Sequence, residues 1–335
     1  MSLLHHVQLQ SFTTFGVPAI CDHYLKIESE EALTDMLDSL PKPISVLGGG
    51  SNVLLTGNMQ GTLIHNAILG KTIVDEEGDE VTVRIGAGEE WHALVLWTLE
   101  EGLYGLENLS LIPGKVGAAP IQNIGAYGVE QEEYFVGLEC IHLTNGRHFV
   151  FSHEECEFGY RDSFFKNEGK GQYCITAVYY KLSKRPNLRL KYGAISNALV
   201  ARSIDQPTPK DVSDVVIEIR QSKLPDPAII GNGGSFFKNP ILPTADVDRL
   251  KAQWGDMPIY PVDEDTQKLS AGWLIDQCGW KGRRVGETGT YANHALVLVN
   301  HGDATGAEIW AVAEHIIGDV QDKFGVTLEP EVNRW

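Results

Sequence analysis

Ser235 is the residue whose setting most directly suggests chemistry. In Gly231–Pro240, GNGGSFFKNP, it follows a run of glycines and precedes two phenylalanines. Glycines let a backbone approach a ligand closely, so this serine could be a nucleophile, a proton donor or only a turn residue. A hydrolase elbow, G-x-S-x-G, is excluded because Phe237 occupies the second glycine position. The β-lactamase pattern S-x-x-K is present up to Lys238 without its companions S-D-N and K-T-G, so this segment alone favours a turn residue.

Basic residues lie close in sequence to this serine, although the chain as a whole is acidic. With 45 acidic and 27 basic residues the formal net charge is −18, so an anionic ligand needs a local basic cluster. Arg220, Lys223 and Lys238 supply such a cluster, and Asn239 adds a neutral donor. The Leu224–Pro227 turn, stiffened by two prolines, would hold Lys223 in place. The alternative for Lys223 is a solvated surface lysine.

Two further segments place charged residues in distinctive settings. Arg161 lies beside aromatic residues in Phe158–Ser163, where the alternative is a surface ion pair with a carboxylate. Glu329 and Glu331 lie on an extended stretch just before the chain ends, where the alternative is a polar terminus. By itself, the terminal segment favours the polar terminus.

Two glycine-rich loops suggest a phosphate-bearing cofactor. Gly48–Val53, GGGSNV, fails the dinucleotide pattern G-x-G-x-x-G because Val53 stands at the last glycine, and no P-loop lysine follows. Its successive backbone N–H groups can still form a concavity that suits a pyrophosphate. Pro113–Pro120 and Gln122–Gly128 are rich in small residues that expose backbone amides. Two such loops favour a large cofactor over a pair of ordinary turns.

The elements that must position these residues are helices and strands in mixed order. Ser29 begins a helical pattern over 32–40, and Ile44–Leu47 is typical of a short buried strand. Val81–Ile85 is typical of a strand, and a helix carrying Trp91, Leu94, Val95 and Trp97 follows it. Gly105–Gly128 shows no helical period, and a segment this long without regular structure is usually functional.

The second half of the chain shows the same mixture. Tyr173–Leu182 is rich in aromatic and β-branched residues and predicts a strand, and Lys184–Asp211 is polar and approaches a domain boundary. Thr305 and Glu308 form a capping box for a helix that Gly325 ends. Without strict alternation of strands and helices, the prediction is α+β domains.

Composition sets broad limits on function. A chain of 335 residues and 36.9 kDa predicts two or three domains. The five cysteines are scattered without a C-x-x-C pair, so we expect free thiols in a reducing cytoplasm and no metal site. The first ten residues lack the features of a signal peptide, and no apolar run is long enough to cross a bilayer. The acidic charge argues against nucleic acid and anionic membranes.

Taken together, the segments resemble one family, the UDP-N-acetylenolpyruvoylglucosamine reductases (UDP-N-acetylmuramate dehydrogenases) of bacterial peptidoglycan synthesis. The resemblance extends over nearly the whole chain, and the order and spacing of its motifs make it specific. The matching segments are Thr14–Gly16, Gly48–Leu54, Gly105–Glu107, Ile112–Gly114, Pro120–Gly128, Gly159–Ser163, Lys223–Pro227, Gly234–Pro240, Ala271–Gln277 and Glu329–Val332.

The resemblance implies an FAD domain of the vanillyl-alcohol-oxidase (PCMH-like) type and a C-terminal α+β substrate domain. The first flavin lobe would be 1–70 joined by 325–335, the second lobe 71–218, and the substrate domain 219–324. Bound FAD would receive hydride from NADPH and pass it to the enolpyruvyl methylene of the nucleotide sugar.

The resemblance also implies roles for individual residues. Arg161, Ser235 and Glu331 would be catalytic. Cofactor binding would fall to Gly48, Gly49, Gly50, Ser51, Asn52, Pro113, Gly114, Gly117, Gln122, Asn123, Gly125 and Ala126. Substrate binding would fall to Tyr127, Tyr192 (of the tyrosine-loop subgroup), Arg220, Lys223, Asn239 and His294.

The chemistry accounts for these residue types. Hydride addition pushes negative charge into the substrate carboxylate, which Arg161 and a protonated Glu331 could stabilise where it develops. The adjacent carbon then needs a proton, and the Ser235 hydroxyl is adequate because that carbon is strongly basic. In the family an arginine follows Glu-Val directly, whereas here it is displaced by one position to Arg334. The Glu-x-Glu-Val spacing favours Glu331 over Glu329 as the catalytic carboxyl.

Two other functions compete with this one. The first is a different oxidoreductase on the same flavin fold, acting on another alcohol or sugar; the KLPDP and GSFFKNP segments argue against it. The second is a nucleotide-sugar sensor without turnover, against which the joint presence of Arg161, Ser235 and Glu331 argues.

Overall fold

The computed structural model describes residues 2–335, which form two compact units. The first unit comprises residues 2–7, Cys21–Gly49 and Met59–Ser222, and the second comprises Gln8–Ile20, Gly50–Asn58 and Lys223–Trp335. The assignment of flavin lobes and a substrate domain is functional and stays a prediction.

A four-stranded sheet with the order β1-β2-β5-β3 builds one part of the first unit, and β2, β5 and β3 run parallel. Its strands are β1 (Leu4–Gln8), β2 (Ile20–Ile27), β3 (Ile44–Leu47) and β5 (Met59–Asn66). The helix α1 (Glu30–Leu37) packs Leu33 and Leu37 into the same apolar cluster as Leu25 and Ile64. Because the Ser29 hydroxyl accepts the Ala32 N–H at 3.2 Å, the predicted start of this helix is confirmed, as is the strand at 44–47.

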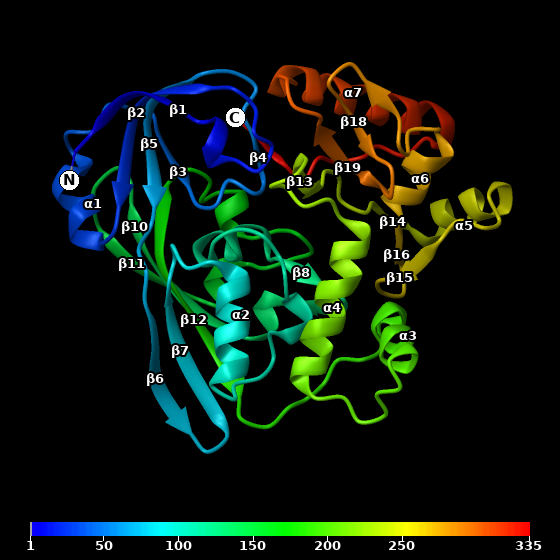
Figure 1. The fold of residues 1–335 in the computed structure, drawn as a ribbon, viewed down its shortest axis with the longest axis horizontal. Coiled ribbons are helices and arrows are strands. Elements are labelled where there is room, and N and C mark those ends of the chain that lie inside the picture. Colours follow the sequence, from blue (N-terminus) through cyan, green and yellow to red (C-terminus); the bar gives the residue numbers. More distant parts are fainter. Residues whose placement is uncertain (1) are drawn as a thin grey trace. The chain divides into compact units, whose positions relative to one another are not determined.

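An antiparallel sheet with the order β11-β10-β12-β7-β6 builds the other part of the first unit. Its strands are β6 (Lys71–Glu77), β7 (Glu80–Gly86), β10 (Phe135–His142), β11 (His148–Ser152) and β12 (Tyr173–Ser183). The helix α2 (Trp91–Glu100) packs on this sheet, with the rings of Trp91 and Tyr180 5.8 Å apart (Figure 1). The strands predicted at 81–85 and 173–182 and the intervening helix are confirmed.

The segment 105–128 contains only single turns of helix, as its lack of periodicity predicts. These are η2 (Glu107–Leu109), η3 (Val116–Ala118) and η4 (Pro120–Gln122), followed by the two-residue strands β8 (Gly125–Ala126) and β9 (Val129–Glu130). Three further 3-10 turns follow in this unit: η5 (Gln131–Glu133), η6 (Glu154–Cys156) and η7 (Phe164–Lys166). With so little regular structure, much of this backbone is left to contact a ligand.

Two helices end the first unit. The sequence did not predict α3 (Gly193–Ala201), which lies within the polar stretch 184–211, and α4 (Pro209–Lys223) begins at the end of that stretch. The two helices share a small apolar cluster of Ile195, Leu199, Val212, Val215 and Val216. The chain passes into the second unit at the end of α4.

An antiparallel sheet with the order β13-β19-β18-β17 is the centre of the second unit. Its strands are β13 (Gly231–Ser235), β17 (Arg284–Val285), β18 (Thr288–Tyr291) and β19 (His294–Asn300). Smaller elements are η1 (Gln10–Phe12), β4 (Val53–Leu54), β14 (Ile241–Pro243), α5 (Thr244–Gln253), β15 (Ile259–Pro261), β16 (Thr266–Leu269), α6 (Ala271–Gln277) and β20 (Asn333–Arg334). The last strand, β20, pairs in parallel with β4.

The helix α7 (Gly306–Phe324) forms as its capping signals predict. The Thr305 hydroxyl accepts the Glu308 N–H at 3.2 Å, and Gly325 ends the helix in the left-handed region at φ 68°. Its apolar face, which includes Ile309 and Ile316, is buried. Together, these units confirm the predicted α+β class.

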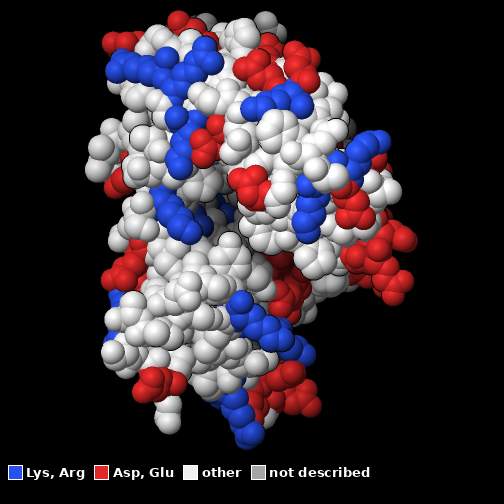
Figure 2. Space-filling view, turned by 90° about the vertical axis from the view of Figure 1, so that its right-hand side faces the viewer, with Lys and Arg blue, Asp and Glu red and all other residues white. Residues whose placement is uncertain are grey.

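Two properties of the described residues bear on partners. Among residues 2–335, none of the helices combines the length and the apolar character needed to cross a membrane. On the face drawn in Figure 2, basic side chains occur in small groups between acidic ones.

Candidate active site

The glycine turn after β3 packs tightly against the loop that begins at Pro113, within the first unit. A Cβ added to Gly49 would lie 3.0 Å from the Cα atom of Gly114, and one added to Gly48 would lie 3.3 Å from the Lys115 Cβ. Within residues 2–335, neither Gly48 nor Gly49 donates its backbone N–H to a hydrogen bond. Two adjacent N–H groups without partners on a crowded turn suit a phosphate, so these residues fit the pyrophosphate of FAD.

Lys115 is a residue of this region that the sequence analysis missed. Its ammonium group lies 2.5 Å from Glu90 Oε1, and its side chain is 18% exposed against 59% for Glu90. A lysine within a glycine loop of an acidic protein was the signal that could have singled it out. The Cβ and Cγ atoms of Lys115 pack beside the glycine turn, so this lysine is a candidate cation for an anionic cofactor group bound there.

The remainder of this loop is held by Asn123. This residue is fully buried in the left-handed region at φ 42°, and its amide donates to Glu130 at 3.0 Å, Glu132 at 2.9 Å and the Gly159 carbonyl at 3.1 Å. Its side chain therefore builds the loop, which leaves its backbone for any cofactor contact. The other predicted cofactor residues of the loop, which are at least partly exposed, are Pro113, Gly114, Gly117, Gln122, Gly125 and Ala126.

Arg161 is fixed against this same loop. It takes the left-handed conformation at φ 54° and donates to the Gly125 carbonyl at 2.5 Å and the Asn123 carbonyl at 3.3 Å. The carboxylate of the alternative interpretation is also present, because Glu130 Oε1 lies 3.8 Å away. Two backbone carbonyls therefore position the guanidinium of Arg161.

Three predicted substrate residues come together in the first unit. The rings of Tyr127 and Tyr192 meet edge to face with their centroids 5.3 Å apart. Burial raises the pKa of Tyr127, which the neighbouring Arg220 partly offsets, and burial lowers the pKa of Arg220. Arg220 Nε donates to the Leu111 carbonyl at 3.1 Å, and within residues 2–335 no carboxylate is among the groups that interact with Arg220. A partly buried arginine without a carboxylate partner, next to Tyr127, suits an anionic, ring-bearing ligand.

In the second unit, a β-bulge directs Ser235. The pairing of β13 with β19 shifts between Asn232 and Ser235, which pairs with Val297. Gly234 takes φ +70° at the bulge and donates its N–H to the Asn232 side chain at 2.9 Å. Bulges change the direction of a side chain at a strand end, so the glycines before Ser235 set its orientation.

Glu331 and Asn52 lie next to this strand. The Glu331 N–H donates to the Phe236 carbonyl at 2.7 Å, and the Asn52 amide donates to the Glu331 carbonyl at 3.1 Å. Ser235 and Glu331 therefore lie on neighbouring segments of one unit. The Glu329 side chain is 73% exposed and lies 3.5 Å from Lys238 Nζ, whereas Glu331 is partly buried.

The remaining predicted residues of the second unit are more spread out. Asn239 accepts the Ala271 N–H at 2.9 Å, which orients its amide donor at the start of α6. His294 Nδ1 is buried without a hydrogen-bond partner among the described residues. Burial lowers the pKa of His294, and the positive charge of Lys223 lowers it further. Lys223 is exposed. Gly50, at φ 61°, is buried, and Ser51 beside it is partly buried.

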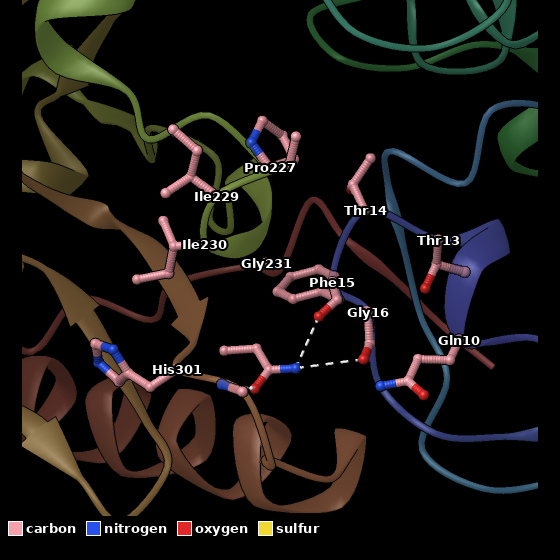
Figure 3. Close-up of a pocket in the computed structure, with 13 residues that line it drawn as sticks. Gln10, Thr13, Thr14, Phe15, Gly16, Pro227, Ile229, Ile230, Gly231 and His301 are labelled. Carbon is pink, nitrogen blue, oxygen red and sulfur yellow. Dashed lines mark hydrogen bonds between the residues drawn. The ribbon is translucent and has the colours of Figure 1, made fainter.

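A cavity of about 650 Å³ lies within the second unit, where the motif Thr14–Gly16 meets residues 227–231 and 300–302 (Figure 3). The Asn300 amide donates to the Phe15 carbonyl at 2.9 Å, and the Asn232 N–H donates to the Thr14 carbonyl at 2.9 Å. None of the predicted site residues lines this cavity. The motif thus supports the strand that carries Ser235.

The predicted catalytic residues are divided between the units: Arg161 belongs to the first, and Ser235 and Glu331 to the second. Arg334, displaced in sequence from the family pattern, lies over the Trp310 ring at 4.9 Å. Among residues 2–335, no group of three His, Cys, Asp or Glu side chains could hold a metal ion.

Two family models match parts of the chain. A family model described as FAD binding domain matches residues 22–152, and one described as UDP-N-acetylenolpyruvoylglucosamine reductase, C-terminal domain, matches 226–335. The flavin-binding domain inferred from the sequence is confirmed by the first of these.

Curated relatives match over nearly the whole chain. The UDP-N-acetylenolpyruvoylglucosamine reductase of Burkholderia vietnamiensis is 49% identical, over 99% of this chain and 96% of its own length. The enzyme of Flavobacterium johnsoniae is 46% identical over 99% of both. The crystal structure of UDP-N-acetylenolpyruvylglucosamine reductase from Thermus caldophilus matches with a TM-score of 0.70 and 27% identity, over 100% of this chain and 99% of that one.

With that identity over nearly full length and both family models in place, the chain belongs to the UDP-N-acetylenolpyruvoylglucosamine reductase family and is an FAD-binding oxidoreductase.

Proposed function

We propose that the protein reduces UDP-N-acetylglucosamine enolpyruvate to UDP-N-acetylmuramate in peptidoglycan synthesis, at the expense of NADPH. The observation that carries this proposal is the 49% identity with a curated reductase over 99% of the chain. When bound, FAD supplies the hydride that is added to the enolpyruvyl methylene.

Arg161 and Glu331 stabilise the charge that hydride addition creates. The electrons move into the substrate carboxylate, which becomes an enolate. Arg161 donates to that group with a fixed, permanently charged guanidinium, which the carbonyls of Asn123 and Gly125 hold in place. Glu331, when protonated, donates a hydrogen bond from its carboxyl O–H to the same group. Its partial burial favours it over the exposed Glu329.

Ser235 donates the proton that completes the reaction. Its O–H bond breaks and a new C–H bond forms at the carbon adjacent to the carboxylate, so the enolate collapses to the product acid. A hydroxyl is a weak acid, but it serves here because the carbon that receives the proton is a strong base. The bulge at Gly234 sets the direction in which the Ser235 side chain leaves the strand, which supports this role.

Binding is shared among the remaining predicted residues. The Gly48–Asn52 turn, with Lys115 as the cation, would hold the pyrophosphate of FAD, and the backbone of the 113–126 loop would hold the flavin. Tyr127, Tyr192 and Arg220 bind the nucleotide sugar from the first unit. In the second unit, the residues that bind the nucleotide sugar are Lys223, Asn239 and His294. The predicted division into two flavin lobes and a substrate domain follows from this assignment.

The partners of the protein are NADPH and the nucleotide sugar. The charge of −18 disfavours nucleic acid and anionic membranes as partners. Five free cysteines support a reducing cytoplasm as its location.

The proposal is tested by following NADPH oxidation at 340 nm in FAD-loaded protein, with and without UDP-N-acetylglucosamine enolpyruvate. We expect a yellow protein whose NADPH oxidation depends on the nucleotide. A colourless protein that FAD cannot reconstitute would contradict the flavin role. A yellow protein that oxidises NADPH only with another alcohol or sugar would point to a different oxidoreductase of this fold.

A further inference from the structure

His92, the second residue of α2, forms a hydrogen bond that fixes both its tautomer and a strained turn. The Leu111 N–H donates to His92 Nδ1 at 3.0 Å. Because Nδ1 accepts, the imidazole is neutral and carries its proton on Nε2. The bond joins α2 to the irregular segment that begins at Gly105.

Leu111 needs such a contact because of its backbone conformation. It lies in the left-handed region at φ 58°, which a branched residue without glycine's freedom adopts only when its surroundings hold it there. Its N–H is held by His92, and its carbonyl accepts from Arg220 Nε at 3.1 Å. The backbone N–H and carbonyl groups of Leu111 thus link His92 to Arg220.

Arg220 depends on this link for its position. Its other polar neighbour is Tyr127, and the nearby Arg161 repels it. No carboxylate forms an ion pair with it within residues 2–335, so a carbonyl rather than a counter-charge orients its guanidinium. A change at Leu111 would therefore move the charge of Arg220.

We propose that His92 is a positioning residue for Arg220: its neutral imidazole holds the left-handed turn at Leu111, whose carbonyl aims the guanidinium at the anionic part of the nucleotide sugar. This inference rests on the proposed function, in which Arg220 binds the substrate.

The arrangement also makes substrate binding sensitive to pH. Protonated His92 could not accept the Leu111 N–H, and it would add a positive charge near Arg220, the charged neighbour that α4 brings to it. Burial lowers the pKa of His92 from its usual 6.5, and the positive charge of Arg220 lowers it further. Substrate binding is therefore intact near neutrality and weakens as the pH falls below 6.5 through the lowered pKa.

Two substitutions of His92 separate the two parts of the inference. His92→Asn keeps an acceptor near the position of Nδ1 but cannot titrate, and His92→Leu removes the acceptor at similar volume. KM for UDP-N-acetylglucosamine enolpyruvate and kcat are measured on FAD-loaded enzyme between pH 5.5 and 8, with thermal unfolding as a check on folding. The exposed His315 on α7 provides the control variant His315→Leu.

We expect His92→Leu to raise KM about tenfold at pH 7.5, the typical effect of leaving one buried donor unpaired, with kcat within about twofold. His92→Asn should keep KM within about twofold and lose the rise of KM that the parent shows at acidic pH. An unchanged KM in His92→Leu, or an acid rise that persists in His92→Asn, overturns the inference. If His92→Leu does not fold, the pH profile of His92→Asn decides.

Arg220→Met distinguishes this inference from the proposed function. If Arg220→Met leaves KM unchanged, the substrate role of Arg220 is wrong and the inference falls with it. If Arg220→Met raises KM and His92→Leu does not, only the positioning role of His92 is wrong.

Discussion

At the scale of single residues, Ser235 shows how its neighbours determine what a side chain can do. Phe237 excludes a hydrolase elbow, and the bulge at Gly234 gives the serine a fixed direction at the end of β13. A hydroxyl on such a strand end would be suited to proton donation, because in the proposed reaction the carbon that it would protonate is a strong base.

Ser235→Ala should therefore separate the two halves of the reaction. We expect flavin reduction by NADPH to stay within about twofold, because it needs no proton from this side chain. Flavin reoxidation by the enolpyruvyl nucleotide should fall at least ~10²-fold, the usual size of an acid–base contribution. Stopped-flow absorbance of the flavin measures both rates.

Ser222→Ala, at an exposed serine on α4, is the matched control and should change neither rate. Equal losses in both half-reactions of Ser235→Ala would rule out the proton-donor role.

At the scale of elements, the glycine turn after β3 and the loop beginning at Pro113 form one structure. Their backbones approach so closely that a methyl group on Gly49 would lie 3.0 Å from the Gly114 Cα atom. Backbone contact of this kind leaves the N–H groups of Gly48 and Gly49 without protein partners among the described residues. The two loops must keep this spacing for the turn to present its amides to a pyrophosphate.

Gly49→Ala should weaken FAD binding by pushing these loops apart. Overpacking of this size typically costs about 1–3 kcal/mol, so we expect FAD affinity to fall roughly tenfold or more. Fluorescence titration of the apoprotein with FAD measures the change. Gly57→Ala serves as the control, because a methyl group there meets no atom within 4 Å. The same FAD affinity in both variants would mean that the loop spacing is not needed.

At the scale of the whole molecule, anionic ligands must bind to a strongly acidic chain. The net charge of −18 repels them at a distance, so local cations must supply the attraction. Lys115 beside the glycine turn and Arg220 without a carboxylate partner within residues 2–335 are such cations. The backbone near each of these two residues also offers hydrogen-bonding groups, which would orient a ligand that the charge attracts.

The cysteines give a whole-molecule test of the packing. Cys21, Cys140, Cys156 and Cys174 are buried, and Cys278 is half-buried. Burial raises the pKa of Cys156 and Cys174 to about 12 and raises those of the others as well, so few thiolates exist near pH 7.5. We expect a maleimide to label Cys278 first in the folded protein and the other four only in denaturant, as peptide mass spectrometry would show.

Cys278→Ser should remove the labelling of the folded protein. Rapid labelling of any of the four buried thiols under native conditions would contradict the packing of the cores that contain them.

The sequence alone was enough to predict the elements whose signals are local. The capping residues Ser29 and Thr305 and the cap at Gly325 marked the ends of α1 and α7, because a cap acts within one turn of its own helix. Alternation and β-branched residues predicted β7 and β12 for the same reason. The resemblance to the reductase family rests on ordered motifs, which a sequence contains in full.

Only the tertiary structure decided how the site is held together. Asn52 meets Glu331 across 279 positions of the chain, and Arg220 meets Leu111 across 109. The role inferred for His92 likewise came from a contact with Leu111 that no local sequence pattern predicts. Hydrogen bonds between distant segments depend on the register in which those segments pack, and a register is fixed by the whole core rather than by the period of any one segment.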